Sequence, residues 1–163
     1  KVSNPLGLRW FRFDAQKGFF LNGKPLKLIV TNRHQDYKEW GNALPDEMHI
    51  RDIKLIKDME GNFLRVSHYP QDPVIMEMCD KLGILTSVEI PTNNLITESD
   101  DFFHHSIENY KEMVRQNFNF PSVIIWTYMN EVMIKYPHRN DLSYRLRYIQ
   151  NIHKLARQVS TVH

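Results

Sequence analysis

The feature that most constrains the fold of this chain is a fourfold alternation of short apolar runs with longer helix-like segments. Each run is rich in β-branched or aromatic residues, as buried strands are. The runs span residues 24–30, 62–66, 84–88 and 121–129. Because every connection is long enough to hold a helix, we expect parallel strand pairing with right-handed crossovers. The sequence therefore predicts an α/β fold with a parallel sheet and helices outside it.

The helix-like segments carry recognisable start and stop residues. Asp46 and Asp72 stand where an N-cap is expected, and Pro73 suits the first helical position. Gly61 and Gly83 stand where helices end. The predicted helices span residues 46–60, 73–82, 102–118 and 141–159. Before the first unit, alternating residues on both sides of Asn22-Gly23 predict a short β-hairpin, because this pair favours a two-residue turn.

Polar side chains follow each predicted strand, at the ends that parallel strands place on one rim of a sheet. They are His34, Arg65, His68, Glu89, Asn130 and Glu131. A single histidine beside a strand can also be a simple packing residue, so we expect a functional role only because these six residues converge on one rim. A carboxylate at the mouth of an apolar strand is partly desolvated, which raises its pKa and suits a general acid. We therefore expect Glu131 to be a proton donor.

Composition narrows the class of protein. The 163 residues are 42% hydrophobic and 25% charged, which is typical of one folded domain, here residues 1–163. The net charge of +2 comes from interspersed residues and indicates neither a nucleic acid nor a membrane as partner. No run approaches the roughly 18 apolar residues that a membrane span needs. The single cysteine, Cys79, lies in an apolar helical pattern and is interpreted as a core residue.

Four ordered motifs resemble the catalytic barrel of glycoside hydrolase family 2, which includes β-galactosidases, β-glucuronidases and β-mannosidases. The matching segments are Gly18–Pro25, Thr31–His34, Asn62–Pro70, and Pro121–Trp126 with Asn130-Glu131. The resemblance implies a (β/α)8 TIM barrel of which this chain holds the first four βα units, preceded by the hairpin. It also implies that residues 1–163 are the N-terminal half of the barrel domain.

The resemblance implies a retaining β-glycosidase, β-galactosidase-like, with Glu131 as acid/base and Asn130 binding the sugar 2-hydroxyl. Arg65 would orient the nucleophile, while His34 and His68 would line the sugar subsite. Glu89, at the exit of the third strand, is assigned to the same binding group. The family's nucleophile comes from a seventh strand, which would lie beyond His163. We therefore expect the isolated chain to be inactive and to associate with itself through its open edges.

The resemblance has local departures. Phe120 stands where many relatives carry a histidine, and Val30-Thr31 replaces a common glycine. Asn93 and Asn94 occupy the region where some β-galactosidases bind magnesium, so we expect neither a metal nor a cofactor. The expected substrate is a β-linked oligosaccharide or glycoside, and the sequence does not identify the sugar. It leaves the compartment open too, although a secretory leader on a longer parent chain would indicate the periplasm or secretion.

Two alternatives remain at this point. One alternative is a metal site, because imidazole suits zinc or nickel. Its ligands would be His34, His68, His104 and His105. Their spacing is poor for a shared ion, because His104 and His105 are adjacent on a predicted helix and point about 100° apart. The other alternative is a non-catalytic carbohydrate-binding or assembly module with sugars stacked on aromatic rings. Its rings would be Trp40, Tyr69 and Trp126.

Overall fold

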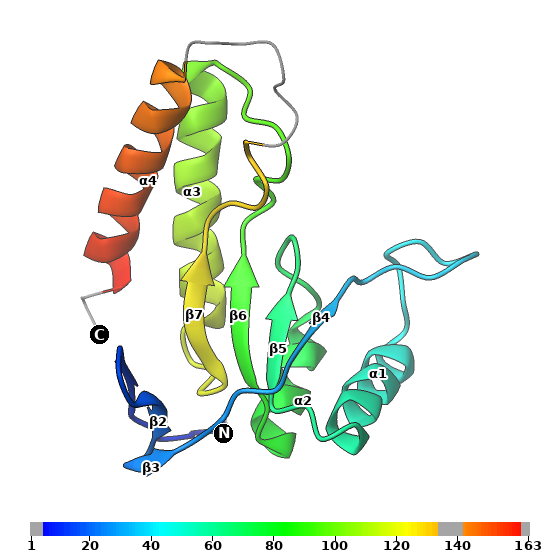
Figure 1. The fold of residues 1–163 in the computed structure, drawn as a ribbon. Coiled ribbons are helices and arrows are strands. Elements are labelled where there is room, and N and C mark those ends of the chain that lie inside the picture. Colours follow the sequence, from blue (N-terminus) through cyan, green and yellow to red (C-terminus); the bar gives the residue numbers. More distant parts are fainter. Residues whose placement is uncertain (1–4, 134–141, 161–163) are drawn as a thin grey trace, which may run out of the picture.

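A computed structural model describes residues 5–133 and 142–160 and begins with a small antiparallel sheet (Figure 1). Its strands are β1 (Phe11–Asp14), β2 (Gly18–Leu21) and β3 (Lys24–Pro25). Asn22 and Gly23 form the two-residue turn between β2 and β3, with φ values of 48° and 81°. Positive φ at both positions is what a primed hairpin turn requires. The hairpin predicted at Asn22-Gly23 is confirmed.

A four-stranded parallel sheet forms the centre of the fold, in the order β4-β5-β6-β7. The strands are β4 (Val30–Arg33), β5 (Phe63–Val66), β6 (Leu85–Glu89) and β7 (Val123–Thr127). The prediction of residues 24–30 as the first strand was wrong. Lys24 and Pro25 pair with β2 instead, and Leu26 and Leu28 pack against the hairpin's apolar cluster, so the sheet strand starts only at Val30.

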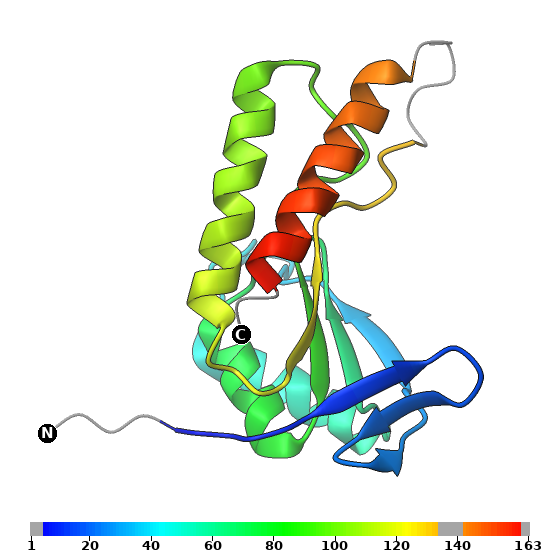
Figure 2. The ribbon, with the colours of Figure 1, turned by 90° about the vertical axis from the view of Figure 1, so that its left-hand side faces the viewer.

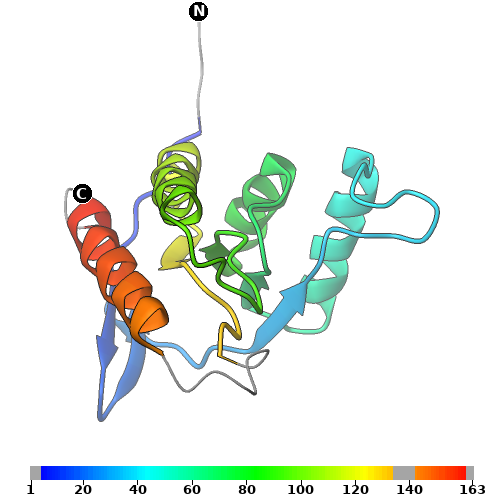
Figure 3. The same ribbon diagram turned by 90° about the horizontal axis from the view of Figure 1, so that it is seen from above.

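Four helices cover one face of this sheet. They are α1 (Asp46–Asp58), α2 (Pro73–Leu82), α3 (Asp100–Asn117) and α4 (Ser143–Ser160). Seen from above, they follow one another along the outside of the sheet (Figure 3). Parallel strands with helices on a single outer face are the arrangement of a (β/α)8 barrel, here with four βα units. None of the described helices is long and apolar enough to cross a membrane.

The helix ends agree only in part with the predicted caps. The Asp72 carboxylate accepts a bond from the Val74 amide at 2.9 Å, and Gly83 closes α2 with a φ of 67°. Asp46 does not cap α1, because Pro45 takes the N-cap position and Asp46 lies inside the first turn. Ser99 caps α3, so this helix begins two residues before the prediction. Asp141, the predicted start of the last helix, lies outside the described residues.

Alternation along the strands separates a helix-facing core from an inner face. Leu64, Val66 and Val88 point outward and are at most 1% exposed beneath the helices. Cys79, on α2, is buried in this core as predicted, and burial raises the pKa of its thiol to about 12. Burying each aliphatic side chain of this size stabilises the fold by roughly 1.5–3 kcal/mol.

The antiparallel sheet covers the inner face where the parallel strands begin. Phe19 of β2 packs with Phe63, Leu85 and Ile124 in a second apolar cluster. The chain before β1 is tied to the same end, because the Arg9 guanidinium donates to the carbonyl oxygens of Pro121 and Val123 at 3.0 and 2.7 Å. Figure 2 shows this sheet beside the lower ends of the strands. The hairpin thus covers one end of the inner face, and of the described residues it leaves those at the opposite, carboxyl end uncovered.

Candidate active site

The inner face changes from apolar to polar along the strands. On β5, Phe63 is followed two positions later by Arg65, so both side chains point to the inner face. On β6, Leu85 is followed by Ser87 and Glu89 with the same alternation. Strand register places Arg65 beside Ser87, one alternate position before Glu89. The hairpin covers the apolar half, and the polar half faces the open carboxyl end.

Glu89 lies at the centre of a hydrogen-bonded network and is only 1% exposed. Its Oε2 accepts from Arg65 at 2.9 Å, and its Oε1 lies 2.7 Å from Nδ1 of His68. A buried carboxylate is costly unless it is paired and hydrogen-bonded, and here both oxygens have a partner. The buried Glu89 carboxylate therefore fixes the positions of the Arg65 and His68 side chains.

These contacts also assign the direction of the hydrogen bonds. A carboxylate accepts, so Nδ1 of His68 carries the proton that points to Glu89. Arg65 can only donate, so the 3.3 Å approach of its NH2 group to the same Nδ1 joins two donors and is not a productive bond. The Nε2 atom of a neutral His68 is then left as an acceptor. A hydrogen bond at one ring nitrogen commonly fixes the tautomer of a histidine and thereby the role of its other nitrogen.

Asn130 joins the network three residues after β7 ends. Its Oδ1 accepts from NH2 of Arg65 at 2.8 Å, and its Nδ2 donates to Oδ1 of Asn93 at 2.8 Å. Its backbone is also held, because its amide donates to the Thr92 carbonyl and its carbonyl accepts from the Asn94 amide, both at 2.9 Å. The Asn130 side chain is therefore held from two sides on a fixed backbone.

Glu131 follows Asn130 and turns the chain with a φ of 52°, in the left-handed region. Its position at the carboxyl end of β7 places it at the same end of the sheet as Arg65 and His68. The side chain is exposed, and this differs from the partial burial expected at a strand mouth. The physical reason is that the described strands cover the site from one side only.

His34 completes the rim from β4. It is exposed, and its ring centroid lies 5.1 Å from that of His68 in an edge-to-face arrangement. The next residue fixes its place: the Gln35 amide donates to the Tyr69 hydroxyl at 2.9 Å, and Oε1 of Gln35 accepts from the Asp72 amide at 2.8 Å. The loop after β4 is thereby attached to the loop after β5.

Arg33 points to the opposite face of β4 and is 6% exposed. It donates to Asp52 at 2.9 and 2.8 Å, to Gln71 at 2.8 Å, and contacts Nδ1 of His49 at 3.0 Å. Burial lowers the pKa of His49, and the Arg33 cation acts in the same direction. The pKa of Tyr37 is raised, mainly because its hydroxyl donates to Asp52 at 2.7 Å. This cluster fastens β4 to α1 behind the rim.

The predicted site residues are thus found together at one end of the sheet. Hydrogen bonds connect four of them, namely Arg65, His68, Glu89 and Asn130. The ring of His34 lies against that of His68, and Glu131 is the residue that follows Asn130. Sequence reasoning missed Asn93 as a member of the network. The available signal was its position four residues after Glu89, beyond the exit of β6, on the same rim as the other polar residues. The roles assigned to all these residues stay predictions.

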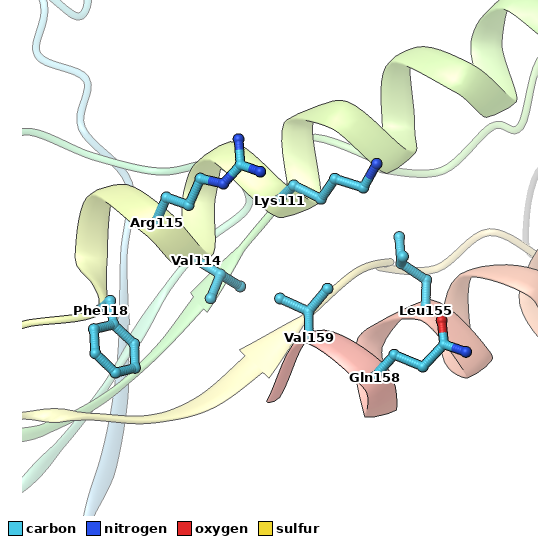
Figure 4. A pocket seen from close by; sticks show the side chains of 7 residues that line it. All are labelled: Lys111, Val114, Arg115, Phe118, Leu155, Gln158 and Val159. Atoms are coloured by element: carbon cyan, nitrogen blue, oxygen red, sulfur yellow. The ribbon is translucent and has the colours of Figure 1, made fainter. Parts of the chain in front are cut away.

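Outside the rim, the described residues form a further groove but no cluster of metal-ligating side chains. A groove of about 530 Å³ lies between α3 and α4, and Figure 4 shows Val114, Phe118, Leu155 and Val159 lining it. It is on the helical layer and includes no residue of the rim. In the described ranges, 5–133 and 142–160, no three His, Cys, Asp or Glu side chains group as a metal ion would require. Trp126 packs against the helix-facing core.

Comparison with known proteins identifies the family. Residues 14–162 match the TIM barrel domain of glycosyl hydrolases family 2. The chain belongs to this family, and its four βα units are part of such a barrel. The fold class and the family expected from the sequence are both confirmed.

Two relatives carry different glycosidase names. A β-glucuronidase of Bacteroides fragilis is 37% identical over 164 residues, covering 96% of this chain and 23% of that protein. A β-galactosidase of Thermoanaerobacterium thermosulfurigenes is 35% identical over 160 residues, covering 98% of this chain and 21% of that protein. The chain thus spans less than a quarter of the length of these relatives.

A solved structure is similar as well. Bacteroides uniformis β-glucuronidase 2, covalently bound to cyclophellitol-6-carboxylate aziridine, superimposes with a TM-score of 0.82 and 44% identity. The match covers 94% of this chain and 18% of that one. These relatives are named as glycosidases of β-linked substrates, and the family to which the chain belongs is one of glycosyl hydrolases.

Proposed function

We propose that this chain supplies the acid/base half of the active site of a retaining β-glycosidase, as the N-terminal half of its barrel domain. The observation that carries the proposal is the network in which Glu89, Arg65 and Asn130 hold one another at the carboxyl ends of adjacent strands. Glu131 follows Asn130 directly, and its side chain is exposed.

In the proposed reaction, Glu131 gives its proton to the glycosidic oxygen as the bond to the anomeric carbon breaks. A second carboxylate, about 5–5.5 Å from the first in retaining enzymes, attacks that carbon and forms a glycosyl-enzyme. Glu131 then takes a proton from the water that hydrolyses this intermediate. The covalent ligand in the Bacteroides uniformis structure supports a covalent step in the family.

Glu89 is a poor candidate for the second carboxylate. Its side chain is 1% exposed, and both of its oxygens already contact Arg65 or His68. A nucleophile must reach the anomeric carbon, so we assign Glu89 to positioning and expect the nucleophile from residues outside this sequence. The chain by itself would then lack turnover.

Binding of the sugar is assigned to the remaining rim residues. Asn130 keeps one N–H and one oxygen lone pair beyond its two bonds, enough to contact the sugar 2-hydroxyl. Nε2 of His68 and the ring of His34 line the same side of the subsite. The substrate class is a β-glycoside, for which the relatives named above offer glucuronides and galactosides as the first compounds to assay.

The test is Glu131→Gln in the full-length enzyme that carries these residues, with Glu112→Gln, an exposed position on α3, as the matched control. We expect Glu131→Gln to lower kcat on an alkyl β-glycoside by about 10²- to 10⁴-fold, the usual contribution of general acid/base catalysis. Affinity for the sugar, measured by calorimetry with the reaction product, should change little. Glu112→Gln should behave as the unaltered enzyme.

The same experiment separates catalysis from simple binding. A carbohydrate-binding module would bind the sugar and show no turnover in the unaltered protein. If the unaltered enzyme hydrolyses the substrate and Glu131→Gln keeps its full rate, Glu131 is not the proton donor and the proposed function of this site fails.

A further inference from the structure

Asn93 is the one member of the network for which the sequence motifs assign no role. It lies beyond the end of β6 and pairs with Asn130 in an isolated parallel bridge. Its backbone neighbours, Thr92 and Asn94, hold the Asn130 peptide on both sides. The segment Thr92–Asn94 thus lies along the residue that precedes the proposed acid/base.

The side-chain contacts form a chain whose direction is determined by chemistry. Arg65 is purely a donor, so Asn130 must turn its oxygen toward Arg65, at 2.8 Å. The amide nitrogen of Asn130 then faces Asn93, and Asn93 must present its oxygen to it, at 2.8 Å. At this position an acceptor is required, and a donor or an apolar group cannot replace it.

Arg65 alone does not fix the Asn130 amide plane, because one hydrogen bond leaves rotation about the side chain free. The second bond, to Asn93, removes that freedom and leaves one N–H and one lone pair of Asn130 available on the open side. Asn93 itself is exposed, so its substitution changes little buried surface. A change at Asn93 should therefore act through Asn130 with little effect on the fold.

We propose that Asn93 is a positioning residue that fixes the orientation of the Asn130 amide and thereby determines how strongly Asn130 binds the sugar 2-hydroxyl. This inference rests on the proposed function, in which Asn130 contacts that hydroxyl. It adds a residue that does not touch the sugar and acts through one side-chain hydrogen bond.

The experiment compares two substrates in the full-length enzyme, an aryl β-glycoside and its 2-deoxy analogue. The glycoside is whichever of the β-D-glucuronide and β-D-galactoside is hydrolysed faster. The variants are Asn93→Leu, which removes the acceptor, and Asn93→Asp, which keeps an oxygen at that place. Asn151→Leu, an exposed asparagine on α4, is the control for losing a surface amide.

We expect Asn93→Leu to lower kcat/KM for the parent glycoside by about tenfold, the usual effect of one hydrogen bond, and for the 2-deoxy analogue by less than about twofold. Asn93→Asp should restore most of the loss on the parent glycoside. In an Asn130→Ala background, Asn93→Leu should have almost no further effect, because the residue through which it acts is gone.

Equal losses on both substrates in Asn93→Leu, or a full further loss in the Asn130→Ala background, would overturn the positioning role. So would Asn93→Leu with unchanged rates on both. Failure of the proposed function has a different signature: Glu131→Gln would then keep full turnover, and Asn130→Ala would not distinguish the two substrates. In that case, a crystal structure of Asn93→Leu decides the positioning role, because an unmoved Asn130 amide contradicts it.

Discussion

Arg33, the last residue of β4, and His34, which follows it, lie on opposite faces of the sheet. Arg33 reaches outward into a buried cluster with Asp52 and Gln71, while His34 lies on the inner side beside His68. Both belong to the short matching segment Thr31–His34, in which the sequence predicted a site role for His34 alone. The pleat of the strand separates the two side chains, because successive side chains alternate between faces. Arg33 supports the scaffold, and His34 is exposed on the rim, where we propose that the sugar binds.

Glu89 is the residue whose loss should affect the site most without touching the substrate. In Glu89→Gln, the amide oxygen can still accept from Arg65 but carries no negative charge, and the amide NH2 faces Nδ1 of His68, which can accept only if the ring proton moves to Nε2. We expect the free energy of unfolding of the 163-residue chain to fall by roughly 1–3 kcal/mol, because charge-assisted hydrogen bonds of a buried group are replaced by weaker neutral ones. Urea denaturation at low protein concentration measures it.

Glu77→Gln is the matched control for this substitution. Glu77 pairs with Lys81 on the surface of α2 at 3.8 Å, and exposed pairs contribute about 0–1 kcal/mol. A loss at Glu89 no larger than that at Glu77 would show that the buried network does not stabilise the chain.

His49 should make stability depend on pH. Its folded-state pKa is lowered by burial, so below about pH 6.5, the ordinary histidine value, the unfolded chain binds a proton that the folded chain resists. The free energy of unfolding should therefore fall as the pH falls through and below that value. His49→Gln should flatten this part of the profile, measured by urea denaturation between pH 5 and 8.

The exposed His105 provides the comparison, since His105→Gln should leave the slope unchanged. A profile that is equally steep in His49→Gln and in the unaltered chain would rule out His49 as the source.

At the scale of elements, the strand-helix alternation, the hairpin at Asn22-Gly23 and α2 were predictable because local signals and tertiary contacts agree there. The first strand was misplaced because Leu26 and Leu28 look like strand residues but pack against the hairpin. The cap at Asp46 failed because Pro45 already provides the extended residue before the helix. Local patterns do not reveal which neighbour a residue will meet.

In the candidate site too, features set by local sequence signals were predictable and features set by tertiary contacts were not. The sequence predicted which strand ends carry polar residues, because parallel strands bring their carboxyl ends to one rim. It did not predict the bond between Asn130 and Asn93, because side-chain pairing across a loop leaves no periodic signal. It also did not predict that Glu131 is exposed, which depends on what covers the rim.

The cap of α2 offers a test at this scale. Asp72→Ala removes the acceptor for the Val74 amide and should lower the free energy of unfolding by about 1 kcal/mol, the usual cost of losing an N-cap. Urea denaturation measures the change. Asp36→Ala, in the exposed loop after β4, should cost less than about 0.5 kcal/mol. Equal costs at the two positions would contradict the capping role.

At the scale of the whole molecule, β4 and β7 are the outer strands of the sheet, and each has one side that pairs with no other described strand. Val30 on β4 is 58% exposed, which is unusual for an apolar strand residue. Open strand edges promote association between copies, so we expect the isolated chain to self-associate at micromolar concentrations. Val30→Lys should weaken this association, as edge lysines do. Sedimentation velocity measures it, and a monomer at all concentrations would contradict the expectation.

The central claim is that Glu131 donates a proton to the departing oxygen, and leaving-group dependence tests it most directly. The full-length enzyme and its Glu131→Gln variant are assayed on aryl β-glycosides whose leaving phenols span a range of pKa. Because an acidic phenol departs without protonation, kcat/KM of the variant, which reports the first step alone, should approach the unaltered value on the most acidic phenol and fall by about 10²-fold or more on the least acidic. A loss of the same size across the whole series would contradict the role assigned to Glu131.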